Sequence, residues 1–143
     1  MRIALTAALV LAATPALAFD CTRATSAVDL AICGDDAALA ANGRMEAAYG
    51  ALRSGLAADG RAMLLAGQRE WLVYRDRRCG AVAACLAEES DNRTASLAST
   101  PAGMAPFFLF QPGVANGYEV MFAGYRFPTP DGAAEMAYEA WFD

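Results

Sequence analysis

Residues 68–79 read QREWLVYRDRRC, and this stretch decides the fold of the first part of the chain. Its apolar side chains recur every three or four residues, as they do along one face of an α-helix. We expect this helix to follow the turn at residues 57–60, with Asp59 as its N-cap, and to end at Gly80. A face that mixes large apolar and polar side chains has to pack against neighbouring helices. The predicted face comprises Leu64, Gln68, Trp71, Leu72, Arg75 and Cys79.

The sequence predicts further helices on both sides of this one. Ser26 followed by Asp29 forms a capping pattern for a short helix that ends at Cys33, before Gly34. A longer helix starts at residue 35 or 36, and a last helix runs to residue 97. Because short connections make neighbouring helices antiparallel, we expect residues 19–97 to form a small antiparallel bundle.

This region contains four cysteines, Cys21, Cys33, Cys79 and Cys85. An even number of cysteines in a small exported protein indicates disulfides. Four cysteines allow three pairings, and proximity in the sequence favours Cys21–Cys33 and Cys79–Cys85. A four-cysteine zinc site is the competing interpretation, but the sequence has no C-x-x-C pair. We therefore expect two local disulfides that hold helix ends, with no metal and no cofactor.

The first 18 residues have the features of a secretory signal peptide. Arg2 gives a positive start, residues 3–13 form an apolar run, and Ala16-Leu17-Ala18 is a small-residue cleavage site. The apolar run is too short to span a bilayer. Cys21 lies three residues beyond the expected cut, which argues against a lipid anchor. We expect cleavage near Ala18, a periplasmic or secreted protein, and no stable membrane insertion.

Residues 98–143 differ in composition from the preceding region, because they hold no cysteine, five of the six prolines and ten of the 14 aromatic residues. Residues 107–110 and 118–127 indicate strands separated by a turn region at 112–117, and Asp131 is placed to cap a short helix with Met136, Ala140 and Trp141. Two strands and one helix rarely stand alone. Either this segment docks on the helices or the chain stops inside a longer β-rich domain, and the apolar residues 140–142 favour the second alternative.

Taken together, these patterns predict a mainly α protein: a small disulfide-pinned antiparallel helical bundle followed by a short β-containing C-terminal segment. The expected divisions are a signal peptide at residues 1–18, the helical domain at 19–97, and residues 98–143 as an appendage or a truncated second domain.

The composition excludes several kinds of chemistry. All 11 basic residues are arginines, and the chain has neither lysine nor histidine. A Ser-His-Asp triad, a Cys-His pair and a lysine Schiff base are therefore impossible. The 16 acidic residues, the net charge of −5 and the pI near 4.6 disfavour binding to nucleic acid. We expect a protein partner.

Two blocks of the sequence carry a resemblance to a known family. The first is CTRATSAVDLAIC at residues 21–33, followed by Leu39, Met45 and Tyr49. The second is residues 68–79, followed by Cys85-Leu86 and residues 93–97. Together they resemble the LprI-like lysozyme-inhibitor N-terminal family over about residues 20–97, although Asn42 stands where that family more often has aspartate. The resemblance implies a small helical cell-envelope domain with paired cysteines that inhibits c-type lysozymes.

The residues around Trp71 are candidates both for the core and for partner contact. We expect Trp71 to anchor the core of the bundle, with Tyr49 and Leu72 beside it. An arginine presented to a cleft with two carboxylates would block a glycosidase. The alternative is pairing within the helix, such as Glu70 with Arg77, or pairing of Asp76 with neighbouring helices. The candidate partner contacts are Arg69, Arg75, Arg77 and Arg78.

The leading functional hypothesis is an exported, non-enzymatic cell-envelope binding protein that inhibits a c-type lysozyme. The alternative is an envelope structural or adaptor domain without activity toward lysozyme. A hydrolase would need a pair of carboxylates, but Glu88 and Glu89 point to different sides of their expected helix. We therefore expect no catalytic residue.

Overall fold

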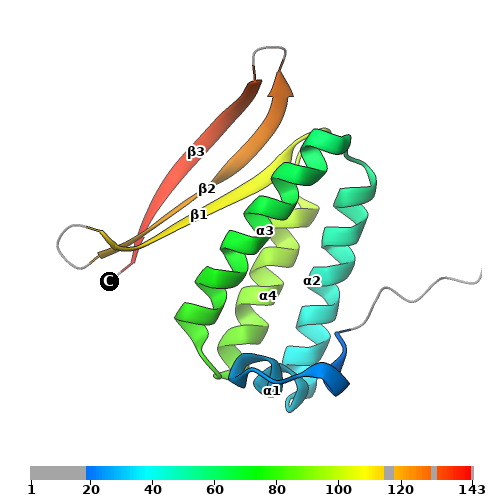
Figure 1. Ribbon diagram of the computed structural model, residues 1–143, viewed down its shortest axis with the longest axis vertical. Coiled ribbons are helices and arrows are strands. Elements are labelled where there is room, and N and C mark those ends of the chain that lie inside the picture. The colour runs from blue at the N-terminus through cyan, green and yellow to red at the C-terminus, as the bar shows by residue number, and fades with distance from the viewer. Residues whose placement is uncertain (1–18, 115–117, 130–131, 143) are drawn as a thin grey trace, which may run out of the picture.

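The computed structural model describes residues 19–114, 118–129 and 132–142, and in this part of the chain four α-helices precede a three-stranded sheet (Figure 1). A short 3-10 helix at Cys21–Arg23 comes first. The helices are α1 (Ala27–Cys33), α2 (Asp36–Ser54), α3 (Ala58–Cys79) and α4 (Ala83–Ala98), and the strands are β1 (Ala105–Val114), β2 (Tyr118–Thr129) and β3 (Gly132–Phe142). The predicted fold class, a mainly α bundle with two disulfides and a β-containing C-terminal segment, is confirmed. The signal peptide predicted for residues 1–18 lies outside the described residues.

Local side-chain chemistry fixes most of the helix ends. Ser26 Oγ accepts a hydrogen bond from the Asp29 backbone N–H at 3.0 Å, and Asp35 Oδ1 accepts one from the Ala38 N–H at 2.9 Å. The prediction that Asp59 caps α3 is wrong, because the helix already starts at Ala58 and its N-cap, Ala57, makes no side-chain bond. Asp59 instead lies in the first turn, where a carboxylate still favours the positive end of the helix dipole.

The disulfides lie at one end of the bundle, where α1 closes it. Cys21 pairs with Cys33 and Cys79 with Cys85, with Cα atoms 5.7 and 5.4 Å apart. The first bond joins the 3-10 helix to the end of α1, and the second joins the end of α3 to the start of α4. Ile32 and Leu86 are buried beside Cys79 in a small second core.

The main core lies between the helices and the sheet. It is built around Leu64, Trp71 and Tyr74 of α3, and β1 contributes Phe108 and Phe110. The ring of Tyr74 lies 4.9 Å from that of Phe108 and 5.5 Å from that of Phe110, measured between centroids. The C-terminal segment therefore docks on the helices, which is the first of the two alternatives left open by the sequence. Among the described residues, no helix is both long enough and apolar enough to cross a membrane.

The short helix predicted around Met136, Ala140 and Trp141 is wrong. These residues lie in β3, where Met136 pairs with Tyr125, Ala140 with Met121 and Trp141 with Val120. Pairing with β2 gives the backbone groups on one edge of β3 hydrogen-bond partners, whereas an isolated helix of this length would be marginal. The expected cap, Asp131, lies outside the described residues. The turn expected from Pro112 is also displaced, because β1 continues to Val114 with a shift of register after Gln111.

Candidate functional site

A buried polar network connects α2, α3 and α4 at the centre of the bundle. Arg93 of α4 donates its Nε–H to Oε1 of Gln68 on α3 at 3.0 Å, and Gln68 Nε2 lies 3.1 Å from Met45 Sδ on α2. The guanidinium groups of Arg75 and Arg93 lie over the ring of Trp71, at 5.3 and 5.7 Å from its centroid. Desolvation lowers the pKa of Arg93 to about 10, so it remains a cation at neutral pH.

Trp71 lies in the core, with only 3% of its surface exposed, and Tyr49 and Leu72 pack partly buried against the same core. Arg75 is 4% exposed, so the structure places it inside the bundle rather than on the surface. Its Nε and Nη2 both donate to Oδ1 of Asp76, at 2.8 and 2.7 Å. Arg75 is therefore committed to internal contacts.

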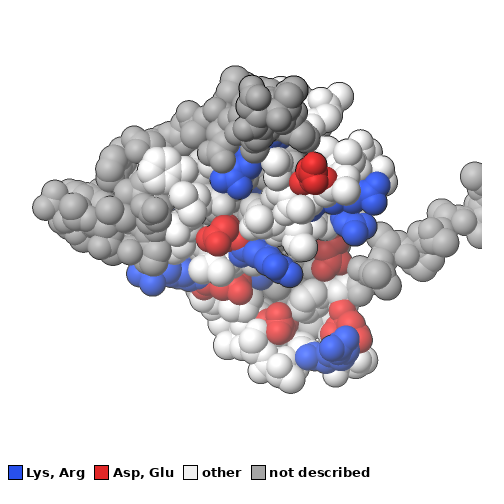
Figure 2. Space-filling model, turned by 45° about the horizontal axis from the view of Figure 1, so that its top comes forward, with Lys and Arg blue, Asp and Glu red and all other residues white. Residues whose placement is uncertain are grey.

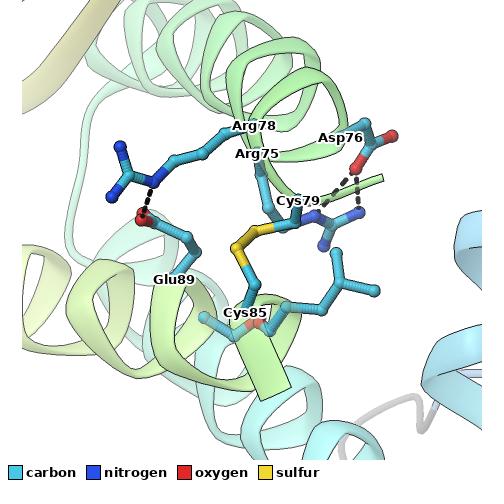
Figure 3. Close-up of a disulfide and its surroundings, with 8 residues drawn as sticks. Arg75, Asp76, Arg78, Cys79, Cys85 and Glu89 are labelled. Carbon is cyan, nitrogen blue, oxygen red and sulfur yellow. Dashed lines mark hydrogen bonds and ion pairs between the residues drawn. A yellow bond between two sulfur atoms is a disulfide. The ribbon is translucent and has the colours of Figure 1, made fainter. Parts of the chain in front are cut away.

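Arg78 projects from α3 on the other side of the Cys79–Cys85 disulfide from Arg75 (Figure 3). Its Nε lies 2.9 Å from Oε1 of Glu89 on α4, and its guanidinium lies 6.0 Å from the ring centroid of Tyr74. Burial raises the pKa of Glu89, and the positive charge of Arg78 only partly offsets this effect. Arg78 thus joins α3 to α4, a pairing between helices that the sequence did not predict.

The other two arginines lie on the solvent-exposed face of α3. Arg69 and Arg77 lie eight residues apart. Two exposed apolar residues complete a spacing of four: Leu65 precedes Arg69 by four residues, and Val73 lies midway between the two arginines. Leu65 is 42% exposed and Val73 58% exposed, so this stripe alternates apolar and cationic side chains along one ridge of the helix. We call Leu65, Arg69, Val73 and Arg77 the α3 ridge. Sequence reasoning missed its apolar members, although their four-residue spacing was visible.

A groove of about 810 Å³ lies between α2 and α3. Its apolar lining includes Met45 and Tyr49 of α2 and Leu72 of α3, and its acidic lining includes Glu46 and Asp76. We call this the α2–α3 groove. It was not predicted, because the sequence does not show how far apart two helices pack.

Several acidic residues of the helices are paired or cap helix ends. On the face shown in Figure 2, acidic and basic side chains are interspersed. Asp35 caps α2, Glu89 pairs with Arg78, and Asp91 accepts hydrogen bonds from Arg44 through both carboxylate oxygens. Among the described residues, no group of three or more Cys, His, Asp or Glu side chains is placed to hold a metal ion.

Comparison with known proteins gives a match for the helical part of the chain. The family model described as "Lysozyme inhibitor LprI" matches residues 21–97, which is more than half of the sequence. No curated protein and no solved structure matches the chain. The matched range includes both disulfides, the whole of α3 with its ridge, and the helical walls of the α2–α3 groove.

Proposed function

Because the chain belongs to the LprI family of lysozyme inhibitors, we propose that it is an exported, non-enzymatic protein that binds and inhibits a c-type lysozyme. The observation that carries this proposal is the family match across the complete helical bundle. Two disulfides suit an oxidising compartment outside the cytoplasm. The signal-like residues 1–18 support export, with cleavage near Ala18.

The α3 ridge is the surface that we assign to the lysozyme. Of the four arginines predicted as partner contacts, Arg75 is buried and Arg78, although exposed, is paired with Glu89. Arg69 and Arg77 are exposed on one ridge, where Arg77 also lies near the ring of Phe110. Lysozymes act through two carboxylates that flank the scissile bond, and a guanidinium group forms two parallel hydrogen bonds with a carboxylate. An arginine of the ridge in that cleft would occupy the position of the substrate.

Val73 and Leu65 supply the apolar part of such a contact. Arginine is enriched at the centre of protein interfaces, and apolar surface buried beside it excludes water from the contact. The ridge therefore has both elements needed to hold a protein and to aim a cation at its active site.

Inhibition of hen-type lysozyme by the mature protein tests this proposal, with both disulfides verified by mass. We expect Arg69→Glu to raise the inhibition constant about tenfold or more, because a charge-assisted hydrogen bond is replaced by repulsion. Arg23→Glu is the matched control, since Arg23 is exposed at the 3-10 helix, far along the chain from the ridge. Arg69 is a cleaner target than Arg77, whose guanidinium also lies 5.8 Å from the ring centroid of Phe110.

Two results would contradict the proposal at different levels. If the disulfide-bonded wild-type protein leaves lysozyme fully active, the proposed inhibition is wrong, and the alternative of an envelope structural or adaptor domain is favoured. If the protein inhibits, but Arg69→Glu and Arg23→Glu behave alike, the function stands and the assignment of the ridge is wrong.

A further inference from the structure

The α2–α3 groove exists because these two helices do not pack closely on each other. Helix α2 packs mainly on α4, whereas α3 packs on β1 (Figure 1). Polar contacts between α2 and α3 include Gln68 Nε2 to Met45 Sδ at 3.1 Å and Arg75 Nη1 to Asn42 Oδ1 at 3.5 Å. These contacts form part of the floor of the groove, and a partly apolar surface above them is left without a covering element among the described residues.

One carboxylate oxygen of Glu46, which lines this groove, lacks a hydrogen-bond partner among the described residues. Its Oε1 accepts a hydrogen bond from Asn42 Nδ2 at 3.0 Å, but its Oε2 is buried and has no hydrogen-bond partner among the described residues. Burial raises the pKa of Glu46, and the bond from Asn42 only partly offsets this effect. A buried carboxylate oxygen without a donor is costly, so a ligand cation that drew the Glu46 carboxylate toward the opening of the groove and donated to it would relieve this cost.

The other charged groups around the groove favour a cation over an anion. Asp29 of α1 and Asp76 of α3 line it with Glu46, and the cations that line it are Arg53 and Arg75. Arg75 is already bound to Asp76, which leaves two carboxylates against Arg53 alone. The groove therefore offers an acidic acceptor next to the apolar side chains of Met45, Tyr49 and Leu72.

We propose that the α2–α3 groove receives a basic segment of the protein target, with a lysine or arginine of that segment bound to Glu46 and its apolar side chains packed on Met45, Tyr49 and Leu72. This inference rests on the proposed function and adds a second contact to it. Leu72 and Asp76 follow Arg69 on α3 by three and seven residues, so the groove and the α3 ridge adjoin on the same helix. One basic lysozyme can contact both surfaces.

The test uses hen-type lysozyme as the probe and the full mature protein. Glu46→Gln keeps the shape of the side chain and an oxygen for Asn42, but it removes the charge that holds the cation. We expect it to weaken lysozyme binding about tenfold or more, as for a charge-assisted hydrogen bond, while thermal unfolding shows an intact fold. Glu88→Gln is the matched control, because Glu88 is exposed on α4 and does not line the groove; its affinity should stay within about twofold of wild type.

A photocrosslinking experiment gives a second, independent readout. A benzoylphenylalanine at Ala47, which is exposed and lines the groove, should crosslink to lysozyme. Binding that survives Glu46→Gln, without a crosslink from Ala47, overturns the groove inference and leaves the proposed inhibition intact. Absence of any lysozyme binding by the disulfide-bonded wild-type protein overturns both proposals.

Discussion

Arg93 of α4 donates its Nε–H to Oε1 of Gln68 on α3 at 3.0 Å, and this hydrogen bond lies inside the bundle. Arg93 is 4% exposed and Gln68 8% exposed, so neither can exchange this bond for water. Nη2 of Arg93 is buried and already lacks a hydrogen-bond partner among the described residues. Gln68 therefore supplies the acceptor that offsets part of the free-energy cost of burying the charge of Arg93.

Gln68→Leu should destabilise the protein by about 2–4 kcal/mol, because it leaves the Nε–H of Arg93 without an acceptor in the core. Urea unfolding followed by tryptophan fluorescence measures this loss. Gln68→Glu is the comparison variant, because its carboxylate keeps an acceptor for Arg93 and adds the opposite charge. Its loss in the free energy of unfolding should be clearly smaller than that of Gln68→Leu. Equal losses in the two variants would show that the packing of Gln68, rather than its bond to Arg93, is what matters.

The helices could be predicted from the sequence because capping residues and an apolar period of 3.6 residues are local signals. Ser26, Asp35 and Gly80 set helix ends as expected. The error at β3 has a different origin, because the pairing of Met136 with Tyr125 depends on a partner strand that a helical pattern does not reveal.

Some contacts of the candidate-site arginines follow from spacing along one helix, and others depend on how the helices pack. Arg75 follows Trp71 by four residues, and this spacing alone places it on the buried face. The burial of Glu89 beside Arg78, by contrast, depends on how α4 packs on α3. The groove was not predictable either, since it depends on how far apart α2 and α3 pack rather than on any motif.

Gly67→Ala should loosen the contact between α3 and β1. A Cβ at Gly67 would lie 2.6 Å from the carbonyl oxygen of Pro106 and 3.0 Å from Cα of Phe107, and backbone atoms cannot turn aside as a side chain can. We expect a loss of about 1–3 kcal/mol in the free energy of unfolding.

Gly50→Ala is the control for this variant, because a Cβ at Gly50 on the exposed side of α2 meets nothing within 4 Å. It should be neutral or stabilise the protein by up to about 1 kcal/mol through better helix propensity. The urea unfolding midpoints of the two variants measure this difference in stability. A Gly67→Ala protein as stable as Gly50→Ala would mean that β1 does not approach α3 this closely.

The Cys79–Cys85 disulfide should contribute about 2 kcal/mol, because it closes a short loop in the unfolded chain. Replacing both cysteines with serine removes the bond and leaves no free thiol, and denaturant unfolding measures the loss. A reducing agent should destabilise the wild-type protein further than it does this variant, since Cys21–Cys33 remains the only bond to reduce in the variant. Identical unfolding midpoints for the variant and the oxidised wild type would contradict a stabilising role.

The buried carboxylate of Glu46 predicts a specific pH dependence of stability. Burial raises its pKa above the ordinary value of 4.5, so between pH 4.5 and the raised pKa the folded protein holds a proton that the unfolded chain releases. Glu46 therefore stabilises the fold least when it is charged, and its contribution to the free energy of unfolding falls as the pH rises through this window.

The difference in unfolding free energy, Glu46→Gln minus wild type, should grow as the pH is raised from about 4 to about 7. Urea unfolding across this range measures it, with Glu88→Gln as the control on an exposed side chain. A difference that stays constant with pH would mean that Glu46 keeps an ordinary pKa in the folded protein.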